Sequence, residues 1–286
     1  MISILLHASE WIILLAQTVG SLLKCLFLTR RVSPILTKPT RELVILGNGP
    51  SLQYTLTADL EKLGAYDLMA VNLFACSDVF GQIRPTHYVW LDPAFAELDH
   101  PAGSKARLAL VQHTTWPLTL WVPRSFQSKD WFFREISKNE YIKFQYFNYV
   151  ICEGFPSITY SIFNSGWGML QCQNVLIASI FLGIRAHYKK IWLTGADHTW
   201  HEDIRLNADN QLEVFDSHFY EKEKNITQLF QMKSSSTSYL SRAFLSLHKV
   251  YRGYEILAGY ALSRGVIVHN ASKKSYIDVF PKLPLA

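Results

Sequence analysis

The chain has 286 residues and a formal net charge of +5, with 49% hydrophobic and 18% charged residues. This length fits one large α/β domain or two small ones, and the composition is that of a globular protein, not a disordered one. No dense run of Lys and Arg interleaved with aromatic residues occurs, which argues against nucleic acid as a partner, whereas a mild positive charge suits an anionic membrane or anionic substrates.

The first 31 residues, MISILLHASEWIILLAQTVGSLLKCLFLTRR, are strongly apolar. A secretory signal requires a basic start, and no Lys or Arg precedes Lys24. The uncharged run 11–23 is shorter than the ~20 residues that span a membrane. This pattern favours a helix lying in a membrane interface with Arg30 and Arg31 at the headgroups. The alternative is a helix that packs on its own domain or on a partner subunit. The polar residues share about one 100° arc of a helical wheel: Ser3, His7, Glu10, Gln17, Ser21 and Lys24.

Residues 32–41 contain two prolines and are expected to be a linker. Beyond them, predicted strands alternate with predicted helices, which indicates a Rossmann-like, mostly parallel sheet with helices on both faces. We expect residues 42–286 to form this domain, with 199–238 as a mobile lid. The predicted strands are 42–47, 67–72, 86–92, 108–112, 118–123, 189–197 and 265–272, and the predicted helices are 56–66, 168–184 and 239–264.

The cysteines and histidines do not predict a metal site. The four cysteines, at positions 25, 76, 152 and 172, lack a CxxC spacing and are expected to be free thiols in a reducing compartment. His198 and His201 lie three residues apart, but no third ligand follows at a recognisable spacing.

Small and polar residues recur where the predicted strands end. The first strand ends in Gly47 to Ser51, the next two in Asn72 and Asp92, and the strand 189–197 in Gly195 to His198. In this fold class ligands bind beyond the carboxyl ends of the strands, where glycine N–H groups can approach a phosphate and Asn amides can donate to phosphate or sugar oxygens. The alternative for each motif is a turn or a cap. The first motif is neither GxGxxG nor a P-loop.

These motifs, in this order, resemble those of a known family of enzymes. LVILGNGPSL, followed by AVNLF, WLDP, NSGWGMLQCQNVLIASIFLGI and KKIWLTGAD, resembles bacterial sialyltransferases of glycosyltransferase family 42 and a larger set of Gly-Asn-Gly-Pro-Ser relatives in polysaccharide loci. The similarity runs from about Glu42 to Phe219. It implies a Rossmann-like, GT-A-like fold that uses a CMP-sugar donor without a bound metal.

The resemblance also implies where the donor would bind. Asn48 would contact the donor phosphate, Asn72 and Asp92 the ribose, phosphate or sugar region, and the segment 164–166 the nucleotide. The residues Gly195 to His198 would lie along the cytidine. The full implied set is Gly47, Asn48, Gly49, Pro50, Ser51, Asn72, Asp92, Asn164, Ser165, Gly166, Gly195, Ala196, Asp197 and His198.

The general base is expected to be a histidine, because its pKa lies near neutral pH. The family places this residue on a lid downstream of its Gly-x-Asp strand, which favours His218 here. His198 and His201 are the alternatives, as is a structural role for all three.

The expected function is transfer of an acidic sugar, sialic acid-like or Kdo-like, from a CMP-sugar to a surface glycan or glycolipid, with inversion, on the cytoplasmic face of the inner membrane. No cofactor is expected, because a single phosphate needs no divalent ion, and the chain has no Asp-x-Asp motif. The enzymatic alternative is an ATP- and Mg²⁺-dependent pyrophosphokinase of the hydroxymethylpterin type, with Asp92, Asp197 and Asp203 at the phosphates. A non-catalytic nucleotide- or glycan-binding subunit is the other alternative, and a homo-oligomer is left open.

Overall fold

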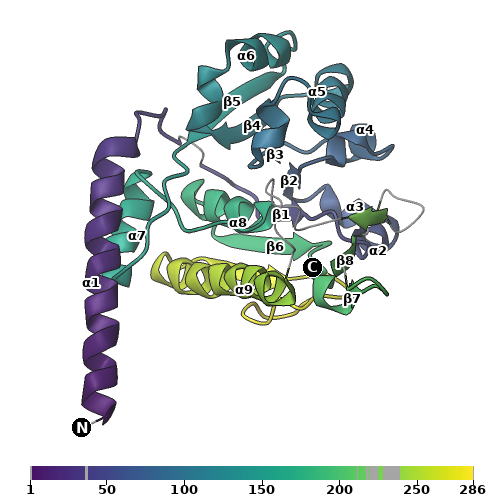
Figure 1. Cartoon of the computed structure of the whole chain (residues 1–286). Coiled ribbons are helices and arrows are strands. Elements are labelled where there is room, and N and C mark those ends of the chain that lie inside the picture. Colours follow the sequence, from purple (N-terminus) through teal and green to yellow (C-terminus); the bar gives the residue numbers. More distant parts are fainter. Residues whose placement is uncertain are drawn as a thin grey trace.

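The computed structural model describes residues 2–35, 38–210, 212–216, 219, 225–227 and 239–285, without the side chains of 2–8, 214–216 and 225–227. Its centre is a seven-stranded parallel sheet in the order β10-β6-β1-β2-β3-β4-β5 (Figure 1). This confirms the predicted α/β fold. The strands are β1 (Leu43–Leu46), β2 (Asp67–Val71), β3 (His87–Val89), β4 (Leu118–Pro123), β5 (Ile142–Phe147), β6 (Lys190–Thr194) and β10 (Ile267–Asn270).

The order of the strands reverses beside β1. The chain builds the sheet outward from β1 to β5, and helix α8 (Val175–Arg185) then returns it to β6 on the other side of β1. Such a reversal leaves a crevice outside the carboxyl ends of the two strands, and open α/β sheets bind their ligands there. The topology therefore locates the candidate site before any side chain is considered.

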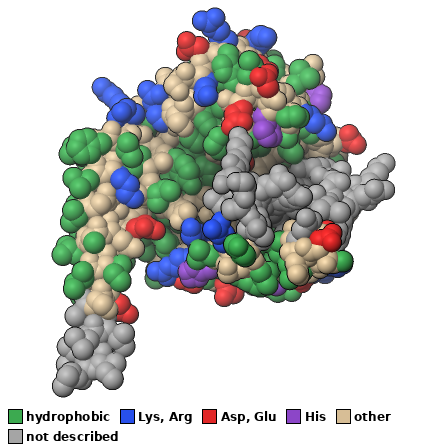
Figure 2. All heavy atoms as spheres, viewed as in Figure 1, with side chains coloured by type: hydrophobic (Ala, Val, Ile, Leu, Met, Phe, Trp, Pro, Cys, Tyr) green, Lys and Arg blue, Asp and Glu red, His purple; other side chains and the backbone are tan. Residues whose placement is uncertain are grey.

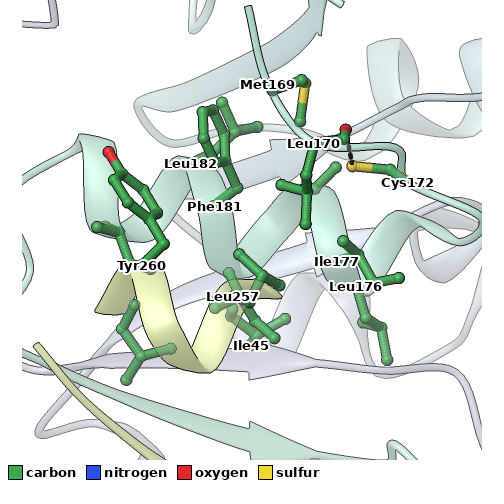
Figure 3. Packing of buried hydrophobic residues seen from close by; sticks show 14 of the residues in the cluster. Ile45, Met169, Leu170, Cys172, Leu176, Ile177, Phe181, Leu182, Leu257 and Tyr260 are labelled. Carbon is green, nitrogen blue, oxygen red and sulfur yellow. Dashed lines mark hydrogen bonds between the residues drawn. The ribbon is translucent and has the colours of Figure 1, made fainter. Parts of the chain in front are cut away.

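Helices cover both faces of the sheet, because alternate residues of each strand point to opposite sides. Leu43 and Ile45 join a core formed with α7 (Pro156–Ser165), α8 and α9 (Leu240–Ser263), part of which Figure 3 shows. Val44 and Leu46 join the opposite core. The helices of that face are α2 (Leu52–Ala58), α3 (Leu60–Leu63), α4 (Phe80–Ile83), α5 (Pro101–His113) and α6 (Asp130–Ile136), with 3-10 turns η1 (Phe74–Cys76), η2 (Pro93–Ala96) and η3 (Arg124–Ser128).

A small antiparallel sheet lies within the segment predicted to be a lid. It consists of β7 (Ile204–Leu206), β8 (Leu212–Asp216) and β9 (Asn225–Thr227), and it follows the 3-10 turn η4 (Trp200–Glu202). The closure of this segment over a ligand stays a prediction.

Three predicted elements differ from the structure. The helix predicted at 56–66 is two short helices, α2 and α3, separated by Asp59. Residues 108–112 are not a strand but the second half of α5, whose buried face includes Ala106, Ala109 and Leu110. The helix predicted from 168 begins only at Val175, because Asn174 caps it by accepting a hydrogen bond from the N–H of Ile177.

Helix α1 (Ile2–Leu28) stands against the side of the domain, with its N-terminal end projecting beyond it (Figure 1). In its second half, Gln17 is exposed, but Ser21 and Lys24 bind the domain. Ser21 Oγ donates to the Glu153 carbonyl at 2.8 Å, and Lys24 Nζ donates to the Ile151 carbonyl at 2.8 Å. In this half, one side of the helix therefore packs on its own domain, as the alternative predicted.

The outward face of α1 is apolar, as the row of hydrophobic side chains along the helix in Figure 2 shows. By length and composition, Ser9–Leu28 is long and apolar enough to cross a membrane, although its uncharged run 11–23 predicted that it is too short. Only 17% of its most apolar stretch is buried against the rest of the protein. Such a helix is apolar enough to anchor the protein to a membrane. The exposed large hydrophobic residues of α1 are Trp11, Ile12, Ile13, Leu15, Val19, Leu22, Leu23, Leu26, Phe27 and Leu28.

Candidate functional site

A cleft of about 640 Å³ lies at the switch point, where the carboxyl ends of β1, β2, β3 and β6 meet the N-terminal end of α8 and one face of α9. Among the lining residues that the structure describes there is no Lys or Arg. The polar lining residues are Asn48, Asn72, Asp92, Gln173, Asn174, Asp197, His198, Thr199 and Ser246. The larger apolar and aromatic ones are Leu91, Tyr149, Val175, Leu176, Trp200, Ile204, Leu247 and Val250.

The loops after β1 and β6 approach each other so closely that glycine is required. A Cβ atom on Gly47 would lie 2.4 Å from the Gly195 carbonyl oxygen, and one on Gly195, whose φ is +61°, would lie 2.5 Å from the Gly47 carbonyl oxygen. The N–H of Gly47 donates to Thr194 O at 2.8 Å, and the N–H of Gly49 donates to Gly195 O at 2.9 Å. These two N–H groups hold the loops together, which corrects the expectation that they bind a phosphate.

The Asp197 carboxylate is buried at the wall of the cleft and is bound to Ser51. The Ser51 N–H donates to Asp197 Oδ2 at 2.8 Å, and Ser51 Oγ donates to Oδ1. Burial raises the pKa of Asp197, and these two hydrogen bonds oppose that shift. Because Ser51 precedes α2, the carboxylate also lies at the positive end of that helix. Asp197 therefore holds the β1 loop and the start of α2 in place.

The carboxylates that a magnesium site would need are not assembled. Asp92 Oδ1 accepts the N–H of Ala94 at 2.9 Å and caps η2, and Asp203 is not among the residues lining the cleft. No group of three His, Cys, Asp or Glu side chains in the described part of the chain could hold a metal ion. In the described part of the site, the carboxylates of Asp92 and Asp197 therefore hold backbone N–H groups and do not form a ligand cluster for a divalent cation.

Two asparagines occupy the ends of neighbouring strands. Asn48 Nδ2 donates to Val71 O at 3.3 Å, and Asn48 Oδ1 is buried without a hydrogen-bond partner among the described residues. Asn72 has a positive φ of 51°, which Asn tolerates better than most residues. Its carbonyl accepts hydrogen bonds from Tyr88 and Trp90, so its backbone is fixed where the side chain lines the cleft.

His198 follows Asp197 and is buried in the cleft wall with a φ of +56°. Its Nε2 lies 2.7 Å from Tyr254 Oη and 3.1 Å from Asn174 Nδ2, and its ring centroid lies 4.5 Å from that of Trp200. Burial lowers the pKa of His198 to about 3, so the ring is neutral at physiological pH.

The segment 164–166 does not reach the cleft, which corrects the implied role of Asn164, Ser165 and Gly166. Arg185 donates to the Asn164 carbonyl, and Tyr260 Oη donates to Asn164 Oδ1 at 2.9 Å. Arg185 ends α8, whereas Asn174 at the cleft begins it, and 11 helical residues separate the two places by about 16 Å.

The remaining predicted residues differ in where they lie relative to the cleft. Gly49, Pro50 and Gly195 line the cleft, while Gly47, Ser51 and Ala196 support its loops from behind. His201 lies against the ring of Tyr276, with centroids 4.2 Å apart, and does not line the cleft. The predicted base, His218, lies outside the described residues.

Sequence reasoning missed Asn174 and Tyr254. Asn174 carried a local signal, since an Asn directly before an apolar helical run is a typical N-cap. Tyr254 carried none, because it lies 80 residues from Asn174 and reaches the site only through the packing of α9 on α8.

The fold and the cleft together define a Rossmann-like α/β protein with a polar, largely uncharged site at its switch point. No protein-family model matches the chain. No curated protein matches it. Among solved structures it is similar to the MAf glycosyltransferase from Magnetospirillum magneticum AMB-1, with a TM-score of 0.49 and 12% sequence identity. The match covers 93% of this chain but 37% of the other chain.

Proposed function

We propose that the protein is a glycosyltransferase that transfers an acidic sugar, sialic acid-like or Kdo-like, from a CMP-sugar to a glycan or glycolipid, with inversion and without a metal ion. The observation that carries the proposal is the shared cleft. Asn48, Asn72, Asp92, Asp197 and His198 come from four strand ends and line one cleft of about 640 Å³. This volume lies within the roughly 300–1,000 Å³ of small-molecule sites.

The chemistry of the lining supports a donor with one phosphate. Neutral amides and hydroxyls can stabilise the one additional negative charge that develops on the phosphate as CMP leaves, whereas a nucleoside diphosphate leaving group usually requires a divalent ion. The described lining contains no Lys or Arg, and each of its two carboxylates already accepts a backbone N–H, Asp197 from Ser51 and Asp92 from Ala94. This arrangement also argues against the Mg²⁺-dependent pyrophosphokinase.

The orientation of Asn48 suggests a revised contact. Its Nδ2 points to the Val71 carbonyl, and Oδ1 has no partner among the described groups. A buried acceptor without a donor is costly, so a ligand hydroxyl is the natural partner. We propose that Asn48 accepts a hydrogen bond from a ribose or sugar O–H through Oδ1, and does not contact the donor phosphate.

His218 remains our proposed general base. The resemblance supports this choice, because the family places its histidine downstream of the Gly-x-Asp strand, where His218 follows in this chain. His198 is unsuited to this role, since its pKa of about 3 makes it a weak base at neutral pH. His201 is directed to Tyr276.

We further propose that α1 attaches the protein to the cytoplasmic face of the inner membrane, where the acceptor would be lipid-linked. Ser21 and Lys24 hold one side of the helix on the domain, so the membrane would cover the opposite, apolar side. The positive charges of Arg30 and Arg31 follow its C-terminal end and suit anionic headgroups.

Turnover tests the proposal directly. Full-length protein is incubated with CMP-sialic acid or CMP-Kdo and a lipid-linked glycan extract, and CMP release is followed with and without EDTA. We expect release that EDTA does not change and that His218→Ala reduces by at least 100-fold. Activity only with ATP and Mg²⁺ would support the pyrophosphokinase instead. A donor that binds without any release of CMP would indicate a non-catalytic subunit.

A further inference from the structure

Two side chains from distant parts of the chain and one neighbouring ring hold the ring of His198. Asn174 comes from the start of α8 and Tyr254 from the middle of α9, and both reach the same ring nitrogen, Nε2, at 3.1 and 2.7 Å. Trp200 packs on the ring, and Tyr251 Oη donates to the His198 carbonyl at 3.3 Å. The ring and its backbone are therefore both fixed.

The hydrogen bonds of Asn174 determine which way its amide is turned. Asn174 Oδ1 accepts the N–H of Ile177 at 3.1 Å as the N-cap of α8. A flipped amide would bring its NH₂ group against that N–H, two donors facing each other. The Nδ2 group must therefore face His198.

This orientation fixes the proton on the His198 ring. Asn174 Nδ2 can only donate, and it lies nearer to His198 Nε2, at 3.1 Å, than to its other acceptor, Tyr254 Oη, at 3.4 Å. Tyr254 Oη likewise lies nearer to Nε2, at 2.7 Å, than to Asn174 Oδ1, at 3.4 Å, so we infer that Nε2 accepts from both groups. A neutral imidazole carries one proton, so the proton lies on Nδ1. Nδ1 has no hydrogen-bond partner among the described residues, and His198 lines the cleft.

We propose that His198 is held as the neutral Nδ1–H tautomer and donates this hydrogen bond to an acceptor oxygen of a mononucleotide bound in the cleft, with Asn174 and Tyr254 as positioning residues. This inference rests on the proposed function, since it names a contact within the same site. The acceptor is a phosphate oxygen or the carbonyl of a pyrimidine base, and both are oxygen acceptors that a neutral N–H can bind. In a lining without described Lys or Arg, such a donor binds oxygen without adding charge.

Nitrogen-15 NMR of histidine-labelled full-length protein reads the tautomer without any ligand. We expect one ring, assigned by its loss in His198→Gln, to show a protonated Nδ1 and an unprotonated Nε2 at pH 7. A protonated Nε2 in the ligand-free protein would overturn this inference and leave the proposed function untouched.

Asn174→Asp provides a sharper test. One carboxylate oxygen can still cap α8, but the other can only accept a hydrogen bond, so the ring should change to the Nε2–H tautomer. Gln173→Glu is the matched control, because it makes the same amide-to-carboxylate change on the neighbouring residue, whose amide contacts Ser246 and Gln171 instead of His198. Circular dichroism verifies folding. A folded Asn174→Asp protein with an unchanged tautomer would contradict the proposal.

The proposed contact with a ligand is tested by adding cytidine, CMP or inorganic phosphate to the labelled protein. CMP should shift the Nδ1–H signal, and Tyr254→Phe should bind CMP about tenfold more weakly, as expected for one hydrogen bond in a polar site. A shift with cytidine assigns the base carbonyl as the acceptor, and a shift with phosphate assigns the phosphate. CMP bound without a change at Nδ1 would overturn the donor role. Failure of every probe to bind would overturn that role together with the proposed function, even if the tautomer is as expected.

Discussion

Replacement of Gly195 by Ala tests whether the strand-end glycines are required by packing. Gly195 and Gly265 have the same positive φ of 61°, so an Ala at either place costs about 1–2 kcal/mol of backbone strain. At Gly265 nothing lies within 4 Å of the added Cβ. At Gly195 the Cβ would lie 2.5 Å from the Gly47 carbonyl oxygen and 2.7 Å from Leu52 Cβ, which adds about 1–3 kcal/mol of overpacking.

We therefore expect Gly195→Ala to lose about 3 kcal/mol or more of unfolding free energy and Gly265→Ala about 1 kcal/mol. For a protein of this size these losses correspond to decreases in Tm of roughly 9 °C and roughly 3 °C. Thermal and urea unfolding of the two variants measure the difference. Equal losses would refute the packing argument. An unchanged Tm for Gly195→Ala combined with loss of CMP binding would instead restore the view that this glycine makes room for a ligand.

Three further predictions concern the site, the pH dependence and α1. Asn72→Ala should weaken CMP binding by about 1–3 kcal/mol in calorimetry while leaving Tm within 2–4 °C of the parent, and equal affinity would remove Asn72 from the site. Burial lowers the pKa of His87 to about 4 and that of His198 to about 3, below the ~6.5 of an unfolded chain. The unfolded state therefore binds more protons below pH 6.5, and the free energy of unfolding decreases as the pH is lowered. Each should cost about 2 kcal/mol between pH 7 and pH 5, and a flat urea-unfolding profile over that range would contradict the buried, neutral state of the rings. Ile13→Glu combined with Leu22→Glu, on the exposed side of α1, should reduce co-sedimentation with anionic vesicles at least tenfold, whereas Leu108→Glu on the exposed side of α5 should not; equal binding by both variants would mean that another surface, or a second copy of the chain, covers α1.

Much of the fold could be predicted because its signal is local. The apolar runs that end in Gly, Asn or Asp became β1, β2, β3 and β6, and their carboxyl ends meet at one edge of the sheet because parallel strands must align. The run 108–112 failed because five apolar-rich residues fit a strand and the buried face of a helix equally well.

The errors at the site have another origin. The order of motifs in the chain suggested that Asn164 lies near the donor, but order does not determine at which end of α8 a segment lies. The helical wheel of α1 identified Ser21 and Lys24 as one polar stripe, yet a stripe that binds carbonyl groups of the domain looks the same in sequence as one that binds water. Tyr254 and Asn174 meet only through tertiary packing, which no local pattern reports.

Calorimetric titration of the full-length protein with CMP in the presence of EDTA tests the central claim most directly. The account predicts saturable binding of one CMP per chain that is unaffected by EDTA and weakened in Asn72→Ala. Binding that appears only when Mg²⁺ is restored, or no binding of CMP at all, would contradict a strand-end site built for a single phosphate.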